Sequence, residues 1–572
     1  MGSYPVRWVW AHRLAAAGHA VLRFDLPGSG QSAGTPSDPQ QLHSWLTAIA
    51  QAASWLRHSS GSPIAAIGIG LGGLLALRAS ADGAAIDDLI LWGMPPSGRA
   101  ETRRLQAFAK LQTSAADGED PTLPDGWLQC GGYVLSADTI ADLRTLRPRG
   151  EQVGSLRRTL LLEHDGASVD ATLVENLTQA GVAVDTAPGP GYEAMLDSPE
   201  LSLVPDATIA TVAAWLKQDG APGPSPSEAA PPAGEQARLE IESVVVRERA
   251  FTVTHPSGVM FGVLAEPAQT EPAQTEPTQT PRDDLCLICL PAWAERCSGP
   301  SRLWVEIARR HAARGLPALR MDLHSIGDSD GPRDGMREPH NWDPERIAQV
   351  RRVMDALQER GHGSRFLLIG LCSGAYWAQQ TAVADPRVVG VLGLNTVPSP
   401  SSKALLQADA TRRVLLVLQP SWWRKVARGE VSIKGLVTVA KGIRGRLRAR
   451  LRRRPNAVPS EVDDAPSLSA VLDRFQERGV QIILGYAAQE PGYRQLEVEG
   501  IAQRLEQWPV LRVHGFESSD HNLRAVREQQ AIHTLVDDLI ETQRHRWPRP
   551  SLPESAPDRS AWRSREQRRD RA

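Results

Sequence analysis

The chain has 572 residues, more than one hydrophobic core usually organises, and its length favours at least two sizeable domains. Its 64 Lys and Arg residues nearly balance its 66 Asp and Glu residues, so overall charge gives no drive toward nucleic acid or an anionic membrane. The five cysteines are an odd number in a chain long enough to form its own core, which argues against a disulfide framework.

The first residues lack the pattern of a signal peptide, and no uncharged apolar stretch approaches ~18 residues, so we expect a cytoplasmic protein. Cys286 and Cys289 form a CxxC within the apolar run 285–290. This run predicts a strand, on which residues three apart face opposite sides and cannot share a metal. We therefore predict neither a metal site nor a cofactor.

Residues 219–237 include GAPGPSPSEAAPPAGE, which is rich in Pro, Gly, Ala and Ser without apolar periodicity and is typical of a linker. It separates a predicted first domain, 1–218, from a second domain, 238–543. The stretch AQTEPAQTEPTQT at 268–280 lies between two strand-like segments and predicts an exposed connection. Residues 544–572 are rich in Arg and Pro, and we expect a disordered basic tail.

The two sides of the linker carry matching segments in the same order along the chain. HRLAAAGHAVLRFDLPGSGQSAG at 12–34 parallels RRHAARGLPALRMDLHSIGDSDG at 309–331, IAAIGIGLGGLLALRASA at 64–81 parallels FLLIGLCSGAYWAQQTAV at 366–383, Asp165 parallels Glu490, and Tyr192 parallels His521. Chance similarity would not keep this order, so we predict a tandem duplication.

Within each repeat, short apolar runs alternate with longer segments of helical periodicity. In the second repeat the apolar runs lie at 285–290, 318–322, 366–369, 388–394, 481–484 and 510–513. Continuous apolar strands between helices are typical of a mostly parallel sheet covered on both faces. The predicted fold class is α/β, with two tandem doubly wound sheets.

The sequence GLCSGA at 370–375 follows a predicted strand and precedes a helix that we expect to begin near Gly374. Its glycines stand two positions before and two after Cys372. Small residues are needed there because larger side chains would clash with the neighbouring strand and helix. The pattern resembles the nucleophile elbow of the α/β-hydrolase superfamily, with cysteine in place of the usual serine. The segment DLHSIGDS at 322–329 also resembles the DxxGxGxS turn of these enzymes.

This resemblance implies the order nucleophile, acid, base along the chain. His521 follows the last predicted strand, where the family histidine lies, while His514 ends that strand too early. Glu490 lies in the loop that normally carries the family carboxylate, and would orient the imidazole. A small buried cysteine, a surface histidine and a solvated glutamate remain the alternatives.

The same resemblance implies an oxyanion hole formed by backbone N–H groups. We expect one from Ser373, the residue after the nucleophile, and another from Ala292 or Trp293 in the loop after run 285–290. Ser373 is an alternative nucleophile, but it lies one position past the apex and its side chain should point elsewhere.

The first repeat has glycine, Gly70, where the second has Cys372, and Tyr192 where the second has His521. Asp165 remains at the acid position, but one carboxylate is no triad. The segment GSYPVRW at 2–8 loosely matches GPSRLW at 299–304, so the early strands and the oxyanion loop have no counterpart. Either the start of the chain is wrongly assigned or this unit is degenerate, and in both cases we predict that residues 1–218 form a truncated, non-catalytic partner domain.

Residues 420–455 form a basic insertion with Trp422, Trp423 and Arg424 at its start. Residues 424–454 contain twelve Lys or Arg and one acid, Glu430. This insertion lies between the elbow and the acid residue, and in α/β-hydrolases insertions at this point form a cap over the active site. The insertion could receive an anionic substrate such as an acyl-carrier thioester, could touch a membrane surface, or could be a solvated helix face.

The second half also resembles hydrolases associated with bacterial exosortase and exopolysaccharide systems and, more distantly, dienelactone hydrolase and polyester synthases. The resemblance implies attack by Cys372 on a small-molecule ester or thioester, with an acyl-enzyme intermediate that water hydrolyses. Transfer of the acyl group to an alcohol is the second hypothesis. A non-catalytic interaction protein is the third, and nucleic acid is not an expected partner.

Overall fold

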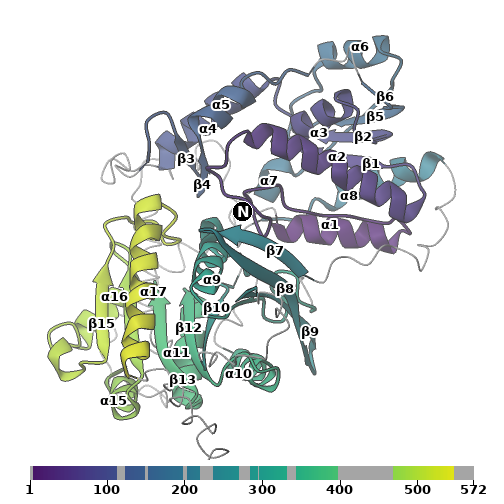
Figure 1. Cartoon of the computed structure of the whole chain (residues 1–572). Coiled ribbons are helices and arrows are strands. Elements are labelled where there is room, and N and C mark those ends of the chain that lie inside the picture. Colours follow the sequence, from purple (N-terminus) through teal and green to yellow (C-terminus); the bar gives the residue numbers. More distant parts are fainter. Residues whose placement is uncertain are drawn as a thin grey trace, which may run out of the picture.

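The computed structural model describes residues 4–112, 123–148, 153–196, 202–219, 236–268, 284–293, 295–331, 343–396 and 468–546. Two bodies follow one another along the chain, the first in purple and blue and the second in teal to yellow (Figure 1). Each is built on its own sheet. The predicted linker 219–237 lies almost wholly outside the described residues, as does the basic insertion 420–455.

The first sheet has four parallel strands in the order β1-β2-β5-β6. Its strands are β1 (Ala65–Ile69), β2 (Asp88–Trp92), β5 (Arg158–Leu162) and β6 (Ala183–Ala187). A small hairpin, β3 (Leu128–Cys130) with β4 (Tyr133–Leu135), stands apart from it. The helices are α1 (Tyr4–Ala16), α2 (Gln41–Ser60), α3 (Leu71–Ala81), α4 (Gly98–Gln112), α5 (Ala137–Leu143), α6 (Ala171–Gln179), α7 (Tyr192–Leu196) and α8 (Asp206–Leu216).

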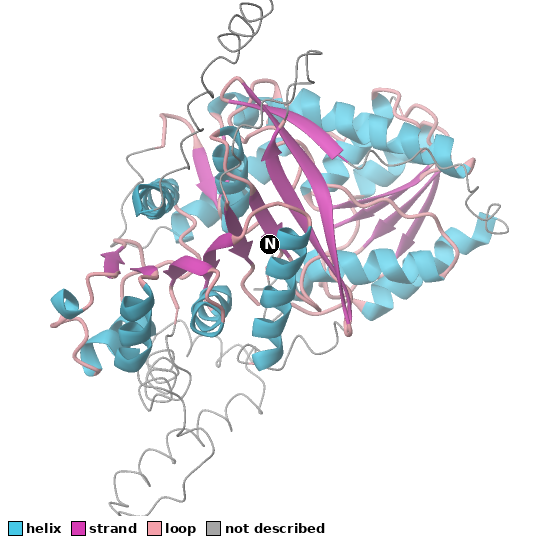
Figure 2. Cartoon of the chain, turned by 60° about the horizontal axis from the view of Figure 1, so that its bottom comes forward, coloured by secondary structure: helices cyan, strands magenta, loops and turns pink. Residues whose placement is uncertain are grey.

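Helices cover both faces of this sheet, and Figure 2 shows its strands between two helical layers. Helices α1 and α8 pack on one face through a cluster that includes Trp10 and Val212. Helices α2, α3 and α6 pack on the other through a cluster that includes Leu77 and Leu177. The first half is therefore a doubly wound layer structure despite its small sheet.

The second sheet has nine strands in the order β15-β14-β13-β12-β10-β11-β9-β8-β7. The parallel strands are β10 (Leu285–Leu290), β11 (Ala318–Met321), β12 (Arg365–Leu371), β13 (Val388–Leu394), β14 (Gln481–Tyr486) and β15 (Leu511–Gly515). Three antiparallel strands extend one edge: β7 (Gln236–Ile241), β8 (Val244–His255) and β9 (Gly258–Pro267).

Helices also cover both faces of the second sheet. One face packs against α9 (Leu303–Ala313) and α17 (Val526–Arg546), and the other against α10 (Pro344–Glu359), α11 (Ser373–Ala384), α15 (Leu468–Arg478) and α16 (Pro491–Val498). Strand β10 lies between these layers with all six residues buried, which explains why it reads as one continuous apolar run. The expected α/β class is confirmed in both halves.

The apolar runs expected to be parallel strands all form strands, with ends that shift by at most two residues. Cys286 packs on one face of β10 and Cys289 on the other, as the two-residue strand period requires. The antiparallel edge β7 to β9 was not expected as part of the same sheet. Helix α17 continues to Arg546, three residues past the expected end of the second domain.

The two halves contact each other through polar side chains. Tyr4 and Arg23 from the first half both donate hydrogen bonds to Asp328 of the second half. Arg296 of the second half forms an ion pair with Asp25 of the first. These partners come from loops at the carboxyl ends of β10 and β11, so the first half sits on that edge of the second sheet.

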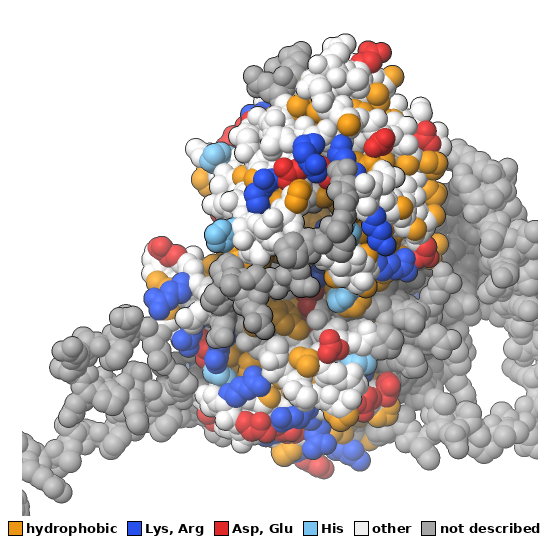
Figure 3. All heavy atoms as spheres, turned by 90° about the vertical axis from the view of Figure 1, so that its right-hand side faces the viewer, with side chains coloured by type: hydrophobic (Ala, Val, Ile, Leu, Met, Phe, Trp, Pro, Cys, Tyr) orange, Lys and Arg blue, Asp and Glu red, His pale blue; other side chains and the backbone are white. Residues whose placement is uncertain are grey.

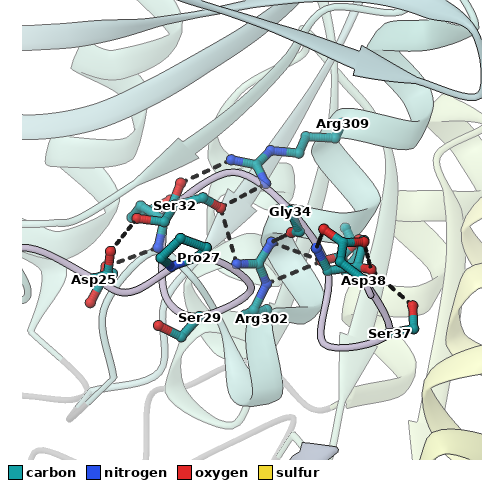
Figure 4. Close-up of polar contacts among 12 residues, drawn as sticks. Asp25, Pro27, Ser29, Ser32, Gly34, Ser37, Asp38, Arg302 and Arg309 are labelled. Atoms are coloured by element: carbon teal, nitrogen blue, oxygen red, sulfur yellow. Dashed lines mark hydrogen bonds and ion pairs between the residues drawn. The ribbon is translucent and has the colours of Figure 1, made fainter. Parts of the chain in front are cut away.

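A turn of the first half, residues 25–34, is held by Arg302, which directly precedes helix α9, and by Arg309 within that helix (Figure 4). Arg302 donates to the carbonyl oxygens of Ser32 and Gly34 at 3.1 and 3.0 Å. Arg309 donates to the carbonyl oxygens of Ser32 and Gln31 at 3.1 and 2.9 Å. Both arginines are buried, so the turn is a docking element rather than a free loop.

A buried charge cluster supports this contact from within the second half. Glu248 accepts hydrogen bonds from Arg309 and Arg320, and Arg320 also donates to the side-chain carbonyl of Gln31 at 2.9 Å. Burial alone would raise the pKa of Glu248, but the two arginines outweigh it and lower the pKa to about 2. The carboxylate therefore stays ionised inside the interface.

On the face in Figure 3, basic and acidic side chains are interspersed, as the near-neutral composition leads one to expect. Across the described ranges, no helix is both long and apolar enough to cross a bilayer.

Candidate active site

Strand β12 ends at Leu371, and helix α11 begins at Ser373, so Cys372 occupies the turn between them. Its backbone has φ 54° and ψ −117°, a conformation that side-chain-bearing residues rarely adopt. Its N–H donates to the carbonyl of Leu394 on β13 at 2.8 Å, which fixes the turn to the neighbouring strand. The turn presents the sulfur at a helix N-terminus and at the carboxyl edge of the sheet.

The two flanking glycines are required by space, as the sequence pattern predicted. A Cβ on Gly370 would lie 2.4 Å from the carbonyl carbon of Gly374, and a Cβ on Gly374 would lie 2.5 Å from the carbonyl oxygen of Pro291. Both neighbours are backbone atoms that cannot move without shifting the sheet or the helix. The spacing of glycines around Cys372 is therefore a packing requirement of this turn.

The structure brings His521 and Glu490 together beside this turn. Nδ1 of His521 lies 2.8 Å from Oε1 of Glu490, and the side chains are 42% and 11% exposed. Burial on its own lowers the pKa of His521, but hydrogen bonds with Cys372 and Glu490 outweigh it and raise the pKa from 6.5 to about 10. The imidazole is thus held in its protonated form between a carboxylate and the thiol.

Asn395, which the sequence analysis did not single out, ties the loops of this site together. It follows β13, is 2% exposed, and donates through Nδ2 to the carbonyl oxygen of His521 at 2.6 Å. Its Oδ1 accepts from the N–H of Ala487 at 2.7 Å, in the loop that leads to Glu490. Asn395 therefore fixes the histidine loop against the carboxylate loop. The only signal in the sequence was a polar residue directly after a buried strand.

The histidine loop is held at a second point by Asp520 and Arg524. The carboxylate of Asp520 accepts hydrogen bonds from the backbone N–H groups of Asn522 and Arg524 and from the guanidinium of Arg524. His514, the weighed alternative base, lies on β15 and its ring packs edge-on against Phe516. His521 is thus the histidine that reaches the elbow.

The groups expected to bind an oxyanion are arranged differently from the prediction at one point. The N–H of Trp293 donates to Oγ of Ser373 at 2.8 Å, so it is already engaged by a side chain. Ser373 is 1% exposed, and its hydroxyl points at this loop and away from the position of a nucleophile. The backbone N–H groups of Ser373 and Ala292 have no hydrogen-bond acceptor among the described residues, so they remain the candidate donors.

The first half contains the same turn without the chemistry. Gly70 lies between β1 and α3 with φ 56° and ψ −128°, and its N–H donates to the carbonyl of Trp92 at 2.9 Å. The hydroxyl of Tyr192 lies 2.9 Å from where a Cβ on Gly70 would be. The carboxylate of Asp165 accepts from the backbone N–H groups on either side of Tyr192, those of Gly191 and Glu193. No attacking atom exists at this turn.

A cavity of about 510 Å³ lies between the two halves, close along the chain to the candidate site. Its second-half lining includes Glu295, two residues after Trp293, and Arg524, three residues after His521. Its first-half lining includes Phe24 and Tyr133. The loops that carry the site residues therefore also form the wall of an interdomain cavity. The expected cap residues Trp422, Trp423 and Arg424 lie outside the described residues.

Residues 9–117 match the family model described as serine aminopeptidase, S33. The comparison with curated proteins gave no match. Similar solved structures include a proline iminopeptidase of Mycobacterium smegmatis (16% identity, covering 51% of this chain and 98% of that one, TM-score 0.31). An esterase of Pyrococcus furiosus shows 11% identity, coverage of 52% and 90%, and a TM-score of 0.34.

A Xanthomonas campestris protein described as an α/β serine hydrolase without a lid shows 13% identity, coverage of 54% and 97%, and a TM-score of 0.30. The family match in the first half and the strand, turn and helix arrangement of both sheets support, at this coarse level, a hydrolase of the α/β-hydrolase superfamily.

Proposed function

We propose that the second half is a cysteine-dependent hydrolase of esters or thioesters, with Cys372 as nucleophile, His521 as base and Glu490 as the orienting acid. The observation that carries the proposal is the contact of one imidazole with both other groups: Nδ1 lies 2.8 Å from Glu490, and the same ring is hydrogen-bonded with Cys372. A helix N-terminus and an adjacent imidazolium both favour negative charge on a sulfur atom. The nucleophile in the proposed mechanism is therefore the Cys372 thiolate, paired with the imidazolium of His521.

In the proposed acylation step, the Cys372 sulfur attacks the carbonyl carbon and the carbonyl oxygen becomes negatively charged. The C–O or C–S bond of the substrate then breaks, and His521 gives its proton to the departing alkoxide or thiolate. Glu490 stabilises the imidazolium before this transfer and keeps Nε2 directed toward the sulfur. The product of this step is an acyl-cysteine thioester.

In the proposed deacylation step, neutral His521 removes a proton from water, and the resulting hydroxide attacks the thioester carbonyl. The C–S bond breaks, the carboxylic acid leaves, and the thiolate and imidazolium are restored. The amides of Ser373 and Ala292 are suited to bind the oxyanion in both steps because neither has another acceptor among the described residues.

Intact-protein mass spectrometry tests the proposal. The full chain is incubated with a panel of acyl thioesters and activated esters, and the mass increase is localised by peptide mapping. We expect one acyl group on Cys372 that disappears with time in water, and none on Cys372→Ala. Adding alcohols to the same reaction distinguishes hydrolysis from acyl transfer, because transfer would yield a new ester. A stable adduct on Ser373, or turnover by Cys372→Ala, would overturn the proposed mechanism.

A further inference from the structure

The hairpin of β3 and β4 connects the first half with the start of helix α17 (Figure 1). The side chain of Gln129 on β3 donates from Nε2 to the carbonyl oxygen of Arg524 at 3.0 Å. Its Oε1 accepts from the N–H of Val526 at 3.3 Å. One side chain of the first half therefore holds two backbone groups of one short segment of the second half.

This contact caps helix α17. Val526 is the first residue of the helix, and the N–H groups of a first helical turn have no acceptor within the helix. The acceptor is usually a side chain of the residue directly before the helix. Here it comes from the other half of the chain, while Nε2 of Gln529 makes only a longer bond of 3.4 Å to the Arg524 carbonyl.

The segment held in this way belongs to the histidine loop, residues 516–525 between β15 and α17. The carboxylate of Asp520 accepts from the N–H and from Nε of Arg524 at 3.0 and 2.8 Å, so the residue before His521 is tied to the end of the loop. Asn395 holds the carbonyl of His521 from within the second half at 2.6 Å. The loop therefore has one anchor in the second half and another in the first.

The tip of the hairpin fits closely against the second half. Gly131 and Gly132 form a two-residue turn with φ values of 59° and 84°, which favour glycine. A Cβ on Gly132 would overlap Oγ of Ser301 and would lie 3.1 Å from Cδ of Arg524. Cys130, directly before the turn, is buried. The hairpin can therefore bring Gln129 to the histidine loop only because its tip has no side chains.

We propose that Gln129 is a positioning residue for His521. It fixes the end of the histidine loop from the first half, so that the imidazole stays beside both Glu490 and Cys372. This role rests on the proposed function of these three residues. The first half thus supports the reaction in the second half although its own turn has no nucleophile.

Kinetics of the full chain test this role through Gln129→Ala. We expect kcat with an activated thioester to fall about tenfold, because the imidazole is less well placed, with little change in KM. Gln129→Glu keeps the acceptor for the Val526 N–H and loses the donor to the Arg524 carbonyl, so its kcat should lie between those of wild type and Gln129→Ala. Gln179→Ala removes an exposed amide at the end of α6 and is the control.

The pH profile separates positioning from a loss of stability. Burial lowers the pKa of His521, but hydrogen bonds with Cys372 and Glu490 outweigh it and raise the pKa to about 10. If Gln129→Ala weakens these bonds, the pKa falls, and the decline in activity at high pH should move to lower pH. A variant that only lost stability would contain less folded protein and would keep the pH of this decline.

The hairpin tip supplies a second pair of variants. Gly132→Leu places a side chain against Ser301 and Arg524 and should lower kcat at least as much as Gln129→Ala. Gly181→Leu is the matched control, because Gly181 has the same φ of 84° and no atom within 4 Å of an added Cβ. Equal kcat in the two leucine variants would contradict a role of the hairpin contact.

Alkylation of Cys372 by iodoacetamide needs no ester or thioester, so it tests the position of His521 apart from the proposed function. The other four cysteines are buried, and peptide mapping follows Cys372 alone. We expect slower alkylation in Gln129→Ala than in wild type, because an adjacent imidazolium favours the reactive thiolate. We also expect faster hydrogen exchange at the amides of residues 521–526 and unchanged exchange in β14.

The outcomes distinguish the two proposals. Equal alkylation and equal exchange in Gln129→Ala and Gln179→Ala would overturn the positioning role and leave the hydrolase proposal standing. Slower alkylation in Gln129→Ala, together with no acyl adduct on wild-type Cys372, would support the positioning of His521 and overturn the hydrolase proposal.

Discussion

The two turns that follow β1 and β12 have nearly the same backbone and opposite chemistry. Gly70 and Cys372 differ by 2° in φ and 11° in ψ, and each donates its N–H to the end of the next strand. One presents a thiol hydrogen-bonded with an imidazole, and the other presents no side chain. The geometry of the turn is therefore independent of whether it carries a reactive group.

The difference extends to two further positions that face these turns. Gly93 follows β2 as Asn395 follows β13, and both residues have positive φ. A Cβ on Gly93 would lie 2.3 Å from the ring of Tyr192, so this ring occupies the space that Asn395 fills in the second half. With glycine at positions 70 and 93, the ring of Tyr192 packs into the space that polar groups occupy in the second half. The site at the first turn is therefore filled by a side chain as well as lacking a nucleophile.

The strongest way to test the comparison is to make the second turn like the first, with Cys372→Gly. We expect loss of acylation and a fall in turnover of ~10³-fold or more, because no attacking atom remains. Stability should change by no more than about 1 kcal/mol, since glycine adopts this φ without strain. Rates with an activated thioester and thermal unfolding measure the two effects. Cys372→Ser serves as the control that keeps a weaker nucleophile.

Removing the carboxylate with Glu490→Gln should lower kcat/KM by roughly 10²-fold and change its pH dependence. Because the pKa of His521 is raised to about 10, the imidazolium persists to that pH, and wild-type activity should be lost as pH rises through it. Without Glu490 the proton is held less tightly, so the decline should move to lower pH. Glu517→Gln, at a carboxylate 88% exposed, is the control. If the decline in activity at high pH did not move, Glu490 would not be the group that holds the proton on His521.

The comparison also predicts a role for Asn395. Asn395→Gly copies Gly93, tolerates the positive φ, and removes the hydrogen bonds to the loops of His521 and Glu490. We expect kcat to fall about tenfold with little change in KM, and stability to fall by about 1–3 kcal/mol because buried partners are left unsatisfied. Asn395→Asp should keep the bond from the Ala487 N–H and lose the one to the His521 carbonyl. An effect on stability alone, with kcat unchanged, would limit Asn395 to a structural role.

The reverse change, Gly70→Ser in a chain that carries Cys372→Ala, should give no activity. Tyr192 fills the space beside the turn and supplies no base, so the added hydroxyl has no proton acceptor. The positive φ and the contact with the tyrosine hydroxyl should cost about 1–3 kcal/mol of stability. Gly72→Ala, two positions along α3 with no atom near its added Cβ, should be neutral or slightly stabilising. Measurable turnover by the Gly70→Ser chain would contradict the filled-site description.

The sequence predicted those features of the fold that depend only on neighbouring residues. The GLCSGA pattern located the turn at Cys372 because two glycines are required there by backbone contacts, and the apolar runs located the strands. Contacts that depend on the tertiary arrangement could not be predicted from the sequence. Three such contacts join segments that are distant in the sequence, and no periodicity predicts that these segments lie together. They are the hydrogen bond from the Trp293 amide to the Ser373 hydroxyl, the hydrogen bonds of Asn395 to two loops, and the hydrogen bonds of Arg302 and Arg309 to the turn at 25–34.

The antiparallel edge β7 to β9 was missed for a related reason. Its strands alternate buried and exposed residues, and the low-complexity stretch 268–280 separates them from β10 along the chain. Nothing in that alternation shows which sheet they join. The pairing of β9 with β11 decides it, and this pairing is a contact between segments more than fifty residues apart.

Because both turns have a positive φ at their apex, substitution of cysteine by glycine there is easier in evolution than substitution of glycine by cysteine. A change from cysteine to glycine is permitted by the backbone at once, whereas the return must reintroduce a side chain into a conformation that disfavours it. Once a ring such as that of Tyr192 has filled the space, the return also requires a second substitution. A copy that loses its nucleophile at this bend thus keeps its fold and its docking surface while the route back to chemistry closes.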